Sequence, residues 1–285
     1  MSIEVKNISY TYMAKTPFER KALENVTLTI EKGEFVAIIG HTGSGKSTLA
    51  EHLNGLLVPS TGTVCVDGVN LKGKGNDVRL AKHKVGIVFQ YPEHQIFAET
   101  IYEDIAFGPR NNGKQEKEVE IQVRNAMQFV GLDYDLFAQR SPFQLSGGQM
   151  RRVAIAGVIA MEPDYLIMDE PSAGLDPVSR DAIFAQLMAV FKKRDIAVIL
   201  ITHSMEEAAQ YADRLLVMSK GQIAIDGKTS EVFKEQRGTL QEVGLDVPES
   251  IKLTDILCAK GLKIEGQALT KEQLVEYIKK AKGWS

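Results

Sequence analysis

The residues best suited to chemistry form one glycine-rich stretch between an apolar run and a helical pattern, Gly40-His41-Thr42-Gly43-Ser44-Gly45-Lys46-Ser47-Thr48. Gly40, Gly43 and Gly45 lack a Cβ atom, so the backbone can adopt positive φ and turn its N–H groups toward an anion. Lys46 adds a positive charge, and the helix that follows adds the partial charge of its N-terminus. The expected ligand is the β- and γ-phosphates of a nucleotide, with the Ser47 hydroxyl on the Mg²⁺ that bridges them.

The alternative for this stretch is an ordinary surface turn. The pattern G-x-x-x-x-G-K-[ST] is expected by chance in roughly one chain in a hundred of this length. Here it also stands between a predicted strand and a predicted helix, which a phosphate-binding loop requires and a surface turn does not. The context therefore favours the phosphate loop.

Polar side chains end three further apolar runs, each a predicted strand: Gln90, Asp169 with Glu170, and His203. Ligands bind at the carboxyl ends of parallel strands, so we expect these side chains to lie near the phosphate loop. Successive strand residues point in opposite directions, which gives Asp169 and Glu170 different roles. Asp169 is placed to hold Mg²⁺ through its water shell, and Glu170 is the candidate base that polarises the attacking water.

The other two strand-end residues have weaker signals. Gln90 is placed to reach Mg²⁺ or the attacking water with a neutral amide, and a surface glutamine is the alternative. His203 is placed to contact the γ-phosphate, and a structural histidine is the alternative.

A second glycine-bearing turn, Leu145-Ser146-Gly147-Gly148-Gln149, runs directly into a helical pattern. Ser146 can cap that helix and donate its hydroxyl, while Gly147 and Gly148 let backbone N–H groups face an anion. A plain helix cap is the alternative. The pentapeptide is expected by chance in roughly one of several thousand chains, which favours a second anion-facing turn.

The elements around these residues indicate an α/β protein with an antiparallel β start. Residues 3–12 and 23–30 alternate apolar and polar side chains as half-buried strands do, and the α/β core follows. Tyr10 and Tyr12 end the first of these predicted strands, just before the loop that contains Pro17. One of them could stack on an adenine ring, and plain packing within the strand is the alternative.

Three helices and a tail are predicted from spacing. Helical spacing of leucines predicts a helix over residues 46–57, a second helix stops at Gly108-Pro109, and a third, strongly charged one covers residues 114–130. From about residue 238 to 285 the chain has two short amphipathic helices, the second opened by a capping box at residues 270–273. This tail is an interaction appendage or packs back on the main domain.

Composition excludes several classes of protein. Apolar residues make up 44% of the 285 residues, charged residues 25%, and the net charge is -3, so nothing points to nucleic acid binding. Cys65 and Cys258 form no C-x-x-C pair, which argues against a zinc site or a disulfide framework. There is no basic-then-apolar signal at the N-terminus, and the longest apolar stretches are about half of a spanning helix. We therefore expect a chain that does not cross a membrane itself.

With these residues in place, the chain resembles the ATP-binding cassette (ABC) ATPases over about residues 3–235. The matching segments are Walker A (40–48), the Q-loop (Gln90), the LSGGQ signature (145–149), Walker B with its catalytic glutamate (165–170), the D-loop (172–176, ending at Asp176), the switch histidine (His203) and the aromatic A-loop position (Tyr12). The resemblance implies a P-loop NTPase core with an antiparallel β subdomain, a helical subdomain at about 91–162, and a small C-terminal helical appendage at 238–285.

A narrower resemblance is to the cytoplasmic ATPases of energy-coupling factor (ECF) transporters, which import vitamins or, in related systems, cobalt or nickel ions. The segments similar to the second of that group's two paralogous ATPases are residues 40–46, 107–111 and 141–152. The C-terminal tail also fits, since such tails can pair two ATPase subunits.

The resemblance implies an ATP hydrolase that uses ATP and Mg²⁺ and acts as a head-to-tail pair of cassettes. ATP then lies between residues 40–47 of one cassette and the signature 145–149 of the other. The implied partners are a second ATPase, identical or paralogous, an integral-membrane coupling subunit gripped by the surface after Gln90, and a substrate-binding membrane subunit. The implied location is the cytoplasmic face of the cell membrane. The alternatives are a cassette of another importer or exporter, a soluble ATP-gated translation or repair ATPase, and a P-loop kinase.

Overall fold

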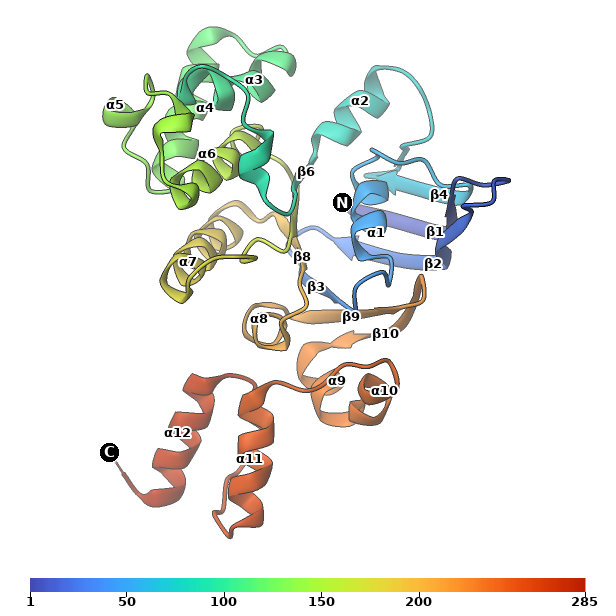
Figure 1. Ribbon diagram of the computed structural model, residues 1–285, viewed down its shortest axis with the longest axis vertical. Coiled ribbons are helices and arrows are strands. Elements are labelled where there is room, and N and C mark those ends of the chain that lie inside the picture. The colour runs from blue at the N-terminus through green and yellow to red at the C-terminus, as the bar shows by residue number, and fades with distance from the viewer. Residues whose placement is uncertain (285) are drawn as a thin grey trace.

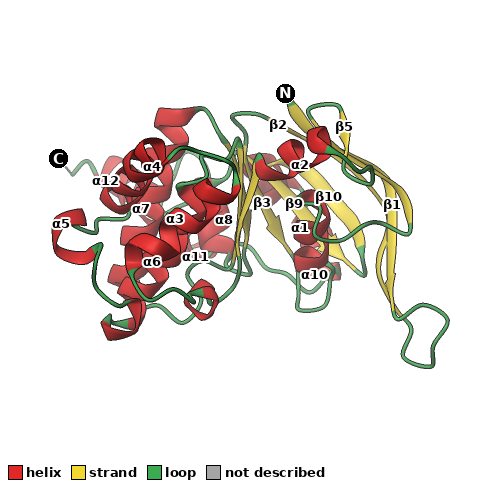
Figure 2. Cartoon of the chain, turned by 90° about the horizontal axis from the view of Figure 1, so that it is seen from above, coloured by secondary structure: helices red, strands yellow, loops and turns green. Residues whose placement is uncertain are grey.

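The computed structural model describes residues 1–284, in which two β-sheets pack face to face with helices on the outer side of the larger one (Figures 1 and 2). The six-stranded sheet has the order β10-β9-β3-β8-β7-β6. Its strands are β3 (Phe35–Ile39), β6 (Val85–Val88), β7 (Tyr165–Asp169), β8 (Ala197–Ile201), β9 (Arg214–Ser219) and β10 (Gln222–Lys228). All neighbours are parallel except β9 and β10, which form an antiparallel hairpin.

The central strands are buried along their whole length because both faces of this sheet are covered. Alternate residues feed two cores: in β3, Phe35, Ala37 and Ile39 face the helices, whereas Val36 and Ile38 face the second sheet. The parallel strands therefore end together at one edge, where the polar residues that follow them meet.

The second sheet is antiparallel, in the order β2-β1-β4-β5. Its strands are β1 (Ser2–Tyr12), β2 (Arg20–Glu31), β4 (Thr61–Val66) and β5 (Val69–Asn70). Helix α1 (Lys46–Leu53) lies on this side of the larger sheet, with Leu49 and Leu53 in the shared core, and α2 (Asn76–His83) follows β5 (Figure 1).

A helical subdomain is inserted between β6 and β7, on the opposite side of the larger sheet from α1 (Figures 1 and 2). It comprises η1 (Pro92–Gln95), α3 (Ile101–Asn111), α4 (Glu116–Phe129), α5 (Tyr134–Phe137), η2 (Pro142–Gln144) and α6 (Gly147–Ile159). Its apolar faces share one core with α7 (Pro177–Arg194) and α8 (Met205–Tyr211).

The chain ends in four helices below the sheets in Figure 1: α9 (Thr229–Glu235), α10 (Arg237–Glu242), α11 (Glu249–Ala259) and α12 (Lys271–Lys282). The two predicted tail helices are α11 and α12, and the Thr270 side chain caps α12 as expected. Leu240, Val247 and Ile251 belong to the main core, so the tail packs back on the domain at its near end. The predicted class, an α/β core with an antiparallel β subdomain, a helical subdomain and a helical appendage, is confirmed. The boundaries at 235 and 238 stay a prediction.

Two predicted helix ends were wrong. Helix α1 ends at Leu53 and excludes Leu57, because Gly55 adopts a left-handed conformation (φ 75°) that stops the helix early. Helix α3 continues through Gly108-Pro109 to Asn111. Pro109 lies in the last turn, where its missing N–H removes a single helical hydrogen bond. Helix α2 was not predicted, because it has only three apolar residues, Val78, Leu80 and Ala81, of which Ala81 alone is buried.

Candidate nucleotide-binding and catalytic site

The phosphate loop joins β3 to α1, and its glycines are required by their surroundings. Gly40 has φ 153°, and a Cβ atom there would come within 2.3 Å of the Met218 carbonyl oxygen. Gly45 has φ 106°, and its Cβ would lie 2.7 Å from the Ala22 carbonyl oxygen. Because β2 and β9 leave no room for a side chain, the neighbouring strands fix the shape of the loop.

Lys46 holds its charge inside this loop. Its Nζ donates to the carbonyl oxygens of Gly40 at 2.8 Å and His41 at 3.2 Å, and the residue is 7% exposed. Burial lowers the pKa of Lys46, and the nearby carboxylates of Glu170 and Asp169 oppose that shift. The ammonium is therefore positioned between the loop and the two acids.

A cavity of about 290 Å³ lies over the loop. It is lined by Thr42, Gly43, Gly45, Lys46, Ser47, Thr48, Gln90 and Glu170. The structure thus brings six of the nine predicted loop residues together with two of the predicted strand-end residues. Ser44 lies beneath the loop, fully buried, close to where a side chain of Gly40 would be.

Asp169 and Glu170 have different partners: Asp169 ends β7, and Glu170 lies one residue beyond the strand. Asp169 is 7% exposed and hydrogen-bonds with the Ser47 side chain at the start of α1. Burial raises the pKa of Asp169, and the hydrogen bond with Ser47 partly offsets this. Ser47 and Asp169 thus place a hydroxyl oxygen and a carboxylate oxygen, both suited to bind a metal ion, beside Lys46.

Glu170 lies between the two other strand-end residues. Gln90 Nε2 donates to Glu170 Oε2 at 2.9 Å, and His203 Nδ1 lies 3.2 Å from Glu170 Oε1. Glu170 itself adopts φ 48°, an uncommon conformation for a residue with a side chain, and its N–H donates to the Ile201 carbonyl at 2.9 Å. Three neighbouring strands, β6, β7 and β8, therefore bring one amide, one carboxylate and one imidazole together.

The two tyrosines have different surroundings. Tyr10 packs against His52 of α1, with ring centroids 4.7 Å apart, and against Tyr12. Tyr12 is 37% exposed, and its hydroxyl lies 3.3 Å from the Thr48 hydroxyl. Tyr12 thus has an exposed ring beside the phosphate loop, whereas Tyr10 is used in packing.

The structure does not bring the signature residues to the phosphate loop. Ser146 caps α6: its Oγ accepts from the Gln149 N–H at 3.3 Å, and Gln149 Oε1 accepts from the Ser146 N–H at 3.0 Å. Leu145, Gly147 and Gly148 are part of this same turn, in the helical subdomain (Figure 1). This glycine-bearing helix start therefore lies apart from the cavity over the loop.

The predicted D-loop residue Asp176 lies at the beginning of α7, away from the cavity lining. Its Oδ1 accepts from the Val178 N–H at 3.0 Å. Ser172, in the same segment, donates to Glu207 of α8 at 2.6 Å.

Three residues near the site were missed from the sequence. Arg151 is 2% exposed and binds Glu93, the Pro171 carbonyl and the Ala173 carbonyl. Glu207 is 5% exposed and accepts hydroxyl hydrogen bonds from two segments of the site. Arg20 lies opposite Tyr12 in β2, and a Cβ on Gly43 would come within 3.0 Å of its Nη2. Arg151 and Glu207 each stand beside an identical residue, Arg152 and Glu206, so residue type alone does not distinguish them.

Comparisons with known proteins agree with this geometry. The family described as ABC transporter matches residues 23–173. The energy-coupling factor transporter ATP-binding protein EcfA2 of Clostridium perfringens is 53% identical over 283 residues, covering 98% of this chain and 99% of the relative. The protein of the same name from Bacillus licheniformis is 48% identical, covering 98% and 97%.

Two solved structures are also similar. One is cbiO1 from Clostridium perfringens, described as part of the ABC transporter complex cbiONQ, with a TM-score of 0.73, 35% identity and coverage of 89% of this chain and 98% of that one. The other is a dimeric post-hydrolysis state of the ATP-binding cassette MJ0796 bound to ADP and Pi, with a TM-score of 0.70, 29% identity and coverage of 80% and 98%.

Within residues 1–284, no helix has both the length and the apolar character needed to span a membrane. The motifs, the fold and near-full-length relatives at about half identity lead to the same assignment. The chain belongs to the ABC transporter family, among the ATP-binding proteins of energy-coupling factor transporters.

Proposed function

We propose that this chain is the ATP-hydrolysing subunit of an energy-coupling factor importer and that Glu170 is its catalytic base. The observation that carries this is the position of Glu170 at the edge of the phosphate-loop cavity, in contact with both Gln90 and His203. In hydrolysis, a water oxygen attacks the γ-phosphorus, the bond to the β,γ-bridging oxygen breaks, and the water's proton passes toward Glu170. Lys46 and the loop N–H groups bind the phosphates, and ADP and phosphate leave.

The donors at the site fit Mg²⁺ bound together with the nucleotide. The Ser47 hydroxyl, the Asp169 carboxylate and the Gln90 amide are oxygen ligands of the kind that Mg²⁺ prefers. Among the described residues, no group of three or more His, Cys, Asp or Glu side chains could hold a metal ion by itself. Ser47, Asp169 and Gln90 would hold the ion together with waters and the substrate phosphates, and the ion would neutralise charge on the phosphates.

The separation of the two glycine-bearing turns supports a composite site between two cassettes. The cap at Ser146 and Gly147 starts a thirteen-residue helix, and such helix starts attract anions. In this proposal residues 145–149 cover the nucleotide held by the loop of a partner ATPase, and Asp176 lies at the same interface. The dimeric structure of MJ0796 bound to ADP and Pi supports this arrangement. The partner is a second copy or a paralogue.

An apolar groove in the helical subdomain is the proposed contact with the membrane subunit. It has a volume of about 370 Å³ and includes Phe97 and Phe107, which are 62% and 50% exposed and pack edge to face with centroids 5.0 Å apart. Gly108 and Gly157 form part of its wall and, having no side chains, leave the groove open there. Such a groove suits a short apolar helix. Gln95, Ile96 and Phe97 in the groove follow Gln90 closely along the chain, so a helix bound in the groove would lie on the segment that carries Gln90. In this proposal the contact is made at the cytoplasmic face of the membrane.

The first test is to purify the tagged chain in mild detergent from its own host and to identify by mass spectrometry what accompanies it. Recovery of a small integral-membrane protein and a second cassette supports the transporter and identifies the partner ATPase. Recovery of ribosomes or DNA, or of the chain alone, contradicts it and favours a soluble ATP-gated protein. Phe97→Ala is expected to lose the membrane protein while it keeps the second cassette. The exposed Leu136→Ala in α5 is the matched control.

The transported substrate class, vitamins or transition-metal ions, is part of the same proposal. It rests on the resemblance to the energy-coupling factor ATPases, the group to which the relatives named above belong. The membrane subunit recovered in the same purification identifies which class applies.

A further inference from the structure

Glu207, on the first turn of α8, joins two segments of the catalytic edge. Its Oε1 accepts from the Ser172 hydroxyl and its Oε2 from the Thr202 hydroxyl, each at 2.6 Å. Glu207 is 5% exposed and Thr202 2% exposed, so water competes little for these bonds. Hydroxyl bonds to an ionised oxygen are short and are roughly twice as strong as bonds between neutral groups.

The two hydroxyls belong to the chain segments that carry Glu170 and His203. Ser172 follows Glu170 by two residues, and Thr202 directly precedes His203. The strand ends are already tied by the hydrogen bond from the Glu170 N–H to the Ile201 carbonyl. Glu207 adds a side-chain connection just beyond it, where β7 and β8 have ended and the backbone no longer pairs.

We propose that Glu207 is a positioning residue that holds Glu170 and His203 in register, and so sets the 3.2 Å contact between them. The inference rests on the proposed function, since it concerns turnover at that site. Glu207 does not touch the substrate. It acts through Ser172 and Thr202, and it keeps the segment that leads to Asp176 at a fixed position relative to the switch histidine.

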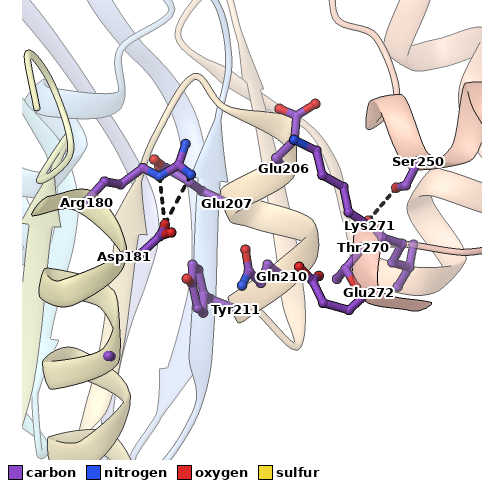
Figure 3. Close-up of a pocket in the computed structure, with 12 residues that line it drawn as sticks. Arg180, Asp181, Glu206, Glu207, Gln210, Tyr211, Ser250, Thr270, Lys271 and Glu272 are labelled. Carbon is purple, nitrogen blue, oxygen red and sulfur yellow. Dashed lines mark hydrogen bonds and ion pairs between the residues drawn. The ribbon is translucent and has the colours of Figure 1, made fainter. Parts of the chain in front are cut away.

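Glu206, which precedes Glu207 on α8, contacts the tail and not the catalytic edge, so it provides a control. Glu206 accepts from the Glu249 N–H at 3.3 Å, at the first residue of α11. Figure 3 shows both glutamates on α8, beside the pocket between α7, α8 and the tail. Two consecutive carboxylates on one helix thus contact the catalytic edge and the appendage separately.

The test uses the full chain assembled with its partner ATPase, with kcat, KM for ATP and Tm measured for each variant. Ser172→Ala and Thr202→Val are each expected to lower kcat about tenfold, with KM within twofold of wild type. Thr202→Ser keeps the hydroxyl and is expected to restore turnover.

Glu207→Ala is expected to lower kcat at least as much as either single hydroxyl variant. Adding Ser172→Ala to it is expected to cause no further loss, because the bond is already gone. Glu207→Gln, which keeps the size of the side chain, separates loss of the carboxylate from loss of packing and is expected to lower kcat as well. Glu206→Gln is expected to leave all three quantities unchanged.

The proposal is overturned if the Glu207 variants lower Tm but leave kcat unchanged, or if the losses from Ser172→Ala and Glu207→Ala multiply. An assembly whose wild-type form does not hydrolyse ATP would instead contradict the proposed function. The two failures are therefore distinguishable.

Discussion

The Gln90 side-chain amide donates to Glu170 over 2.9 Å, although the two residues lie 80 positions apart. The contact exists because β6 and β7 are parallel neighbours that end at the same edge of the sheet. A neutral amide orients the carboxylate without neutralising it. Gln90 therefore links the start of the helical subdomain to the proposed catalytic base.

Glu170→Gln is expected to lower the rate of phosphate release about 100-fold or more, because an amide cannot accept the proton of the attacking water. The shape of the side chain is kept, so ATP is expected to stay bound in a closed pair of cassettes. Size-exclusion chromatography with quantification of bound nucleotide tests this. The exposed Glu99→Gln is the control, and unchanged turnover in Glu170→Gln would remove Glu170 from its role.

Gly40→Ala is expected to destabilise the fold and abolish ATP binding. Its Cβ would lie 2.3 Å from the Met218 carbonyl oxygen, at a φ of 153°. Gly68→Ala is the matched variant: Gly68 also has positive φ, 80°, but nothing lies within 4 Å of its Cβ position. We expect about 1 kcal/mol of lost stability at Gly68 from backbone strain alone and more than 2 kcal/mol at Gly40 from strain and overlap. Urea unfolding measures both, and equal losses would contradict the steric argument.

Arg151→Met is expected to cost about 3 kcal/mol of stability, because it leaves Glu93 and two carbonyl oxygens without their donor in a buried place. Arg151 Nε and Nη2 donate to the Glu93 carboxylate at 3.1 and 3.3 Å, and Nη1 donates to the Ala173 carbonyl at 2.8 Å. Arg152→Met is the control, since within the described residues the Arg152 side chain makes a single hydrogen bond, at 3.4 Å to the Gly148 carbonyl. Denaturant unfolding of the two variants distinguishes them, and similar midpoints would show that the Arg151 network contributes little.

Stability is expected to fall as the pH drops below about 6.5, in part because of His52. The residue is fully buried, its Nδ1 lies 2.7 Å from the Thr48 carbonyl, and burial lowers its pKa. Above the unfolded pKa, His52 is neutral in both states and its contribution is complete. As the pH falls, the unfolded chain takes up a proton that the folded chain resists, so the free energy of unfolding decreases.

His52→Asn is therefore expected to show a smaller difference in Tm between pH 7.5 and pH 5.5 than wild type. The exposed His94→Asn on η1 is the control and is expected to keep the wild-type difference. Burial also lowers the pKa of His83, so part of the pH dependence remains in the variant. An unchanged difference in His52→Asn would contradict the assignment.

Residues whose place in the site depends on where a strand ends were predictable from the sequence. The strand-end placement of Gln90, Glu170 and His203 follows from apolar runs that end in polar residues, and parallel strands then bring them together. The strand pattern alone did not distinguish Tyr10 from Tyr12, because both have the same side chain in the same strand; the family resemblance selected Tyr12. Arg151 and Glu207 could not be separated from their neighbours for a related reason: the phase of a helix relative to the core decides which of two adjacent charges is buried.

The two wrong helix ends have local causes. Gly55 was visible in the sequence, but the leucine spacing through Leu57 suited a longer helix, and one left-handed residue overrode it. Gly108-Pro109 is a common stop signal. Nevertheless α3 continues through both residues to Asn111, and Gly108 lies close to the Met161 side chain. In both cases the conformation or the surroundings of one glycine bear on where the helix ends, and neither can be read from the spacing of apolar residues.

The insertion of the helical subdomain between two paired strands has a consequence for how the sheet is completed during folding. Strands β6 and β7 are parallel, with Val85 opposite Tyr165 and Val88 opposite Met168, so the inserted segment leaves at one edge of the sheet and re-enters at the opposite edge. An unfolded segment of that length would make closure of this strand pair entropically costly and slow. Packing of α3, α4 and α6 into the core that they share with the larger sheet compacts this segment and shortens the effective loop. We therefore expect the strand pair that carries Gln90 and Glu170 to form late, after the inserted helices have packed.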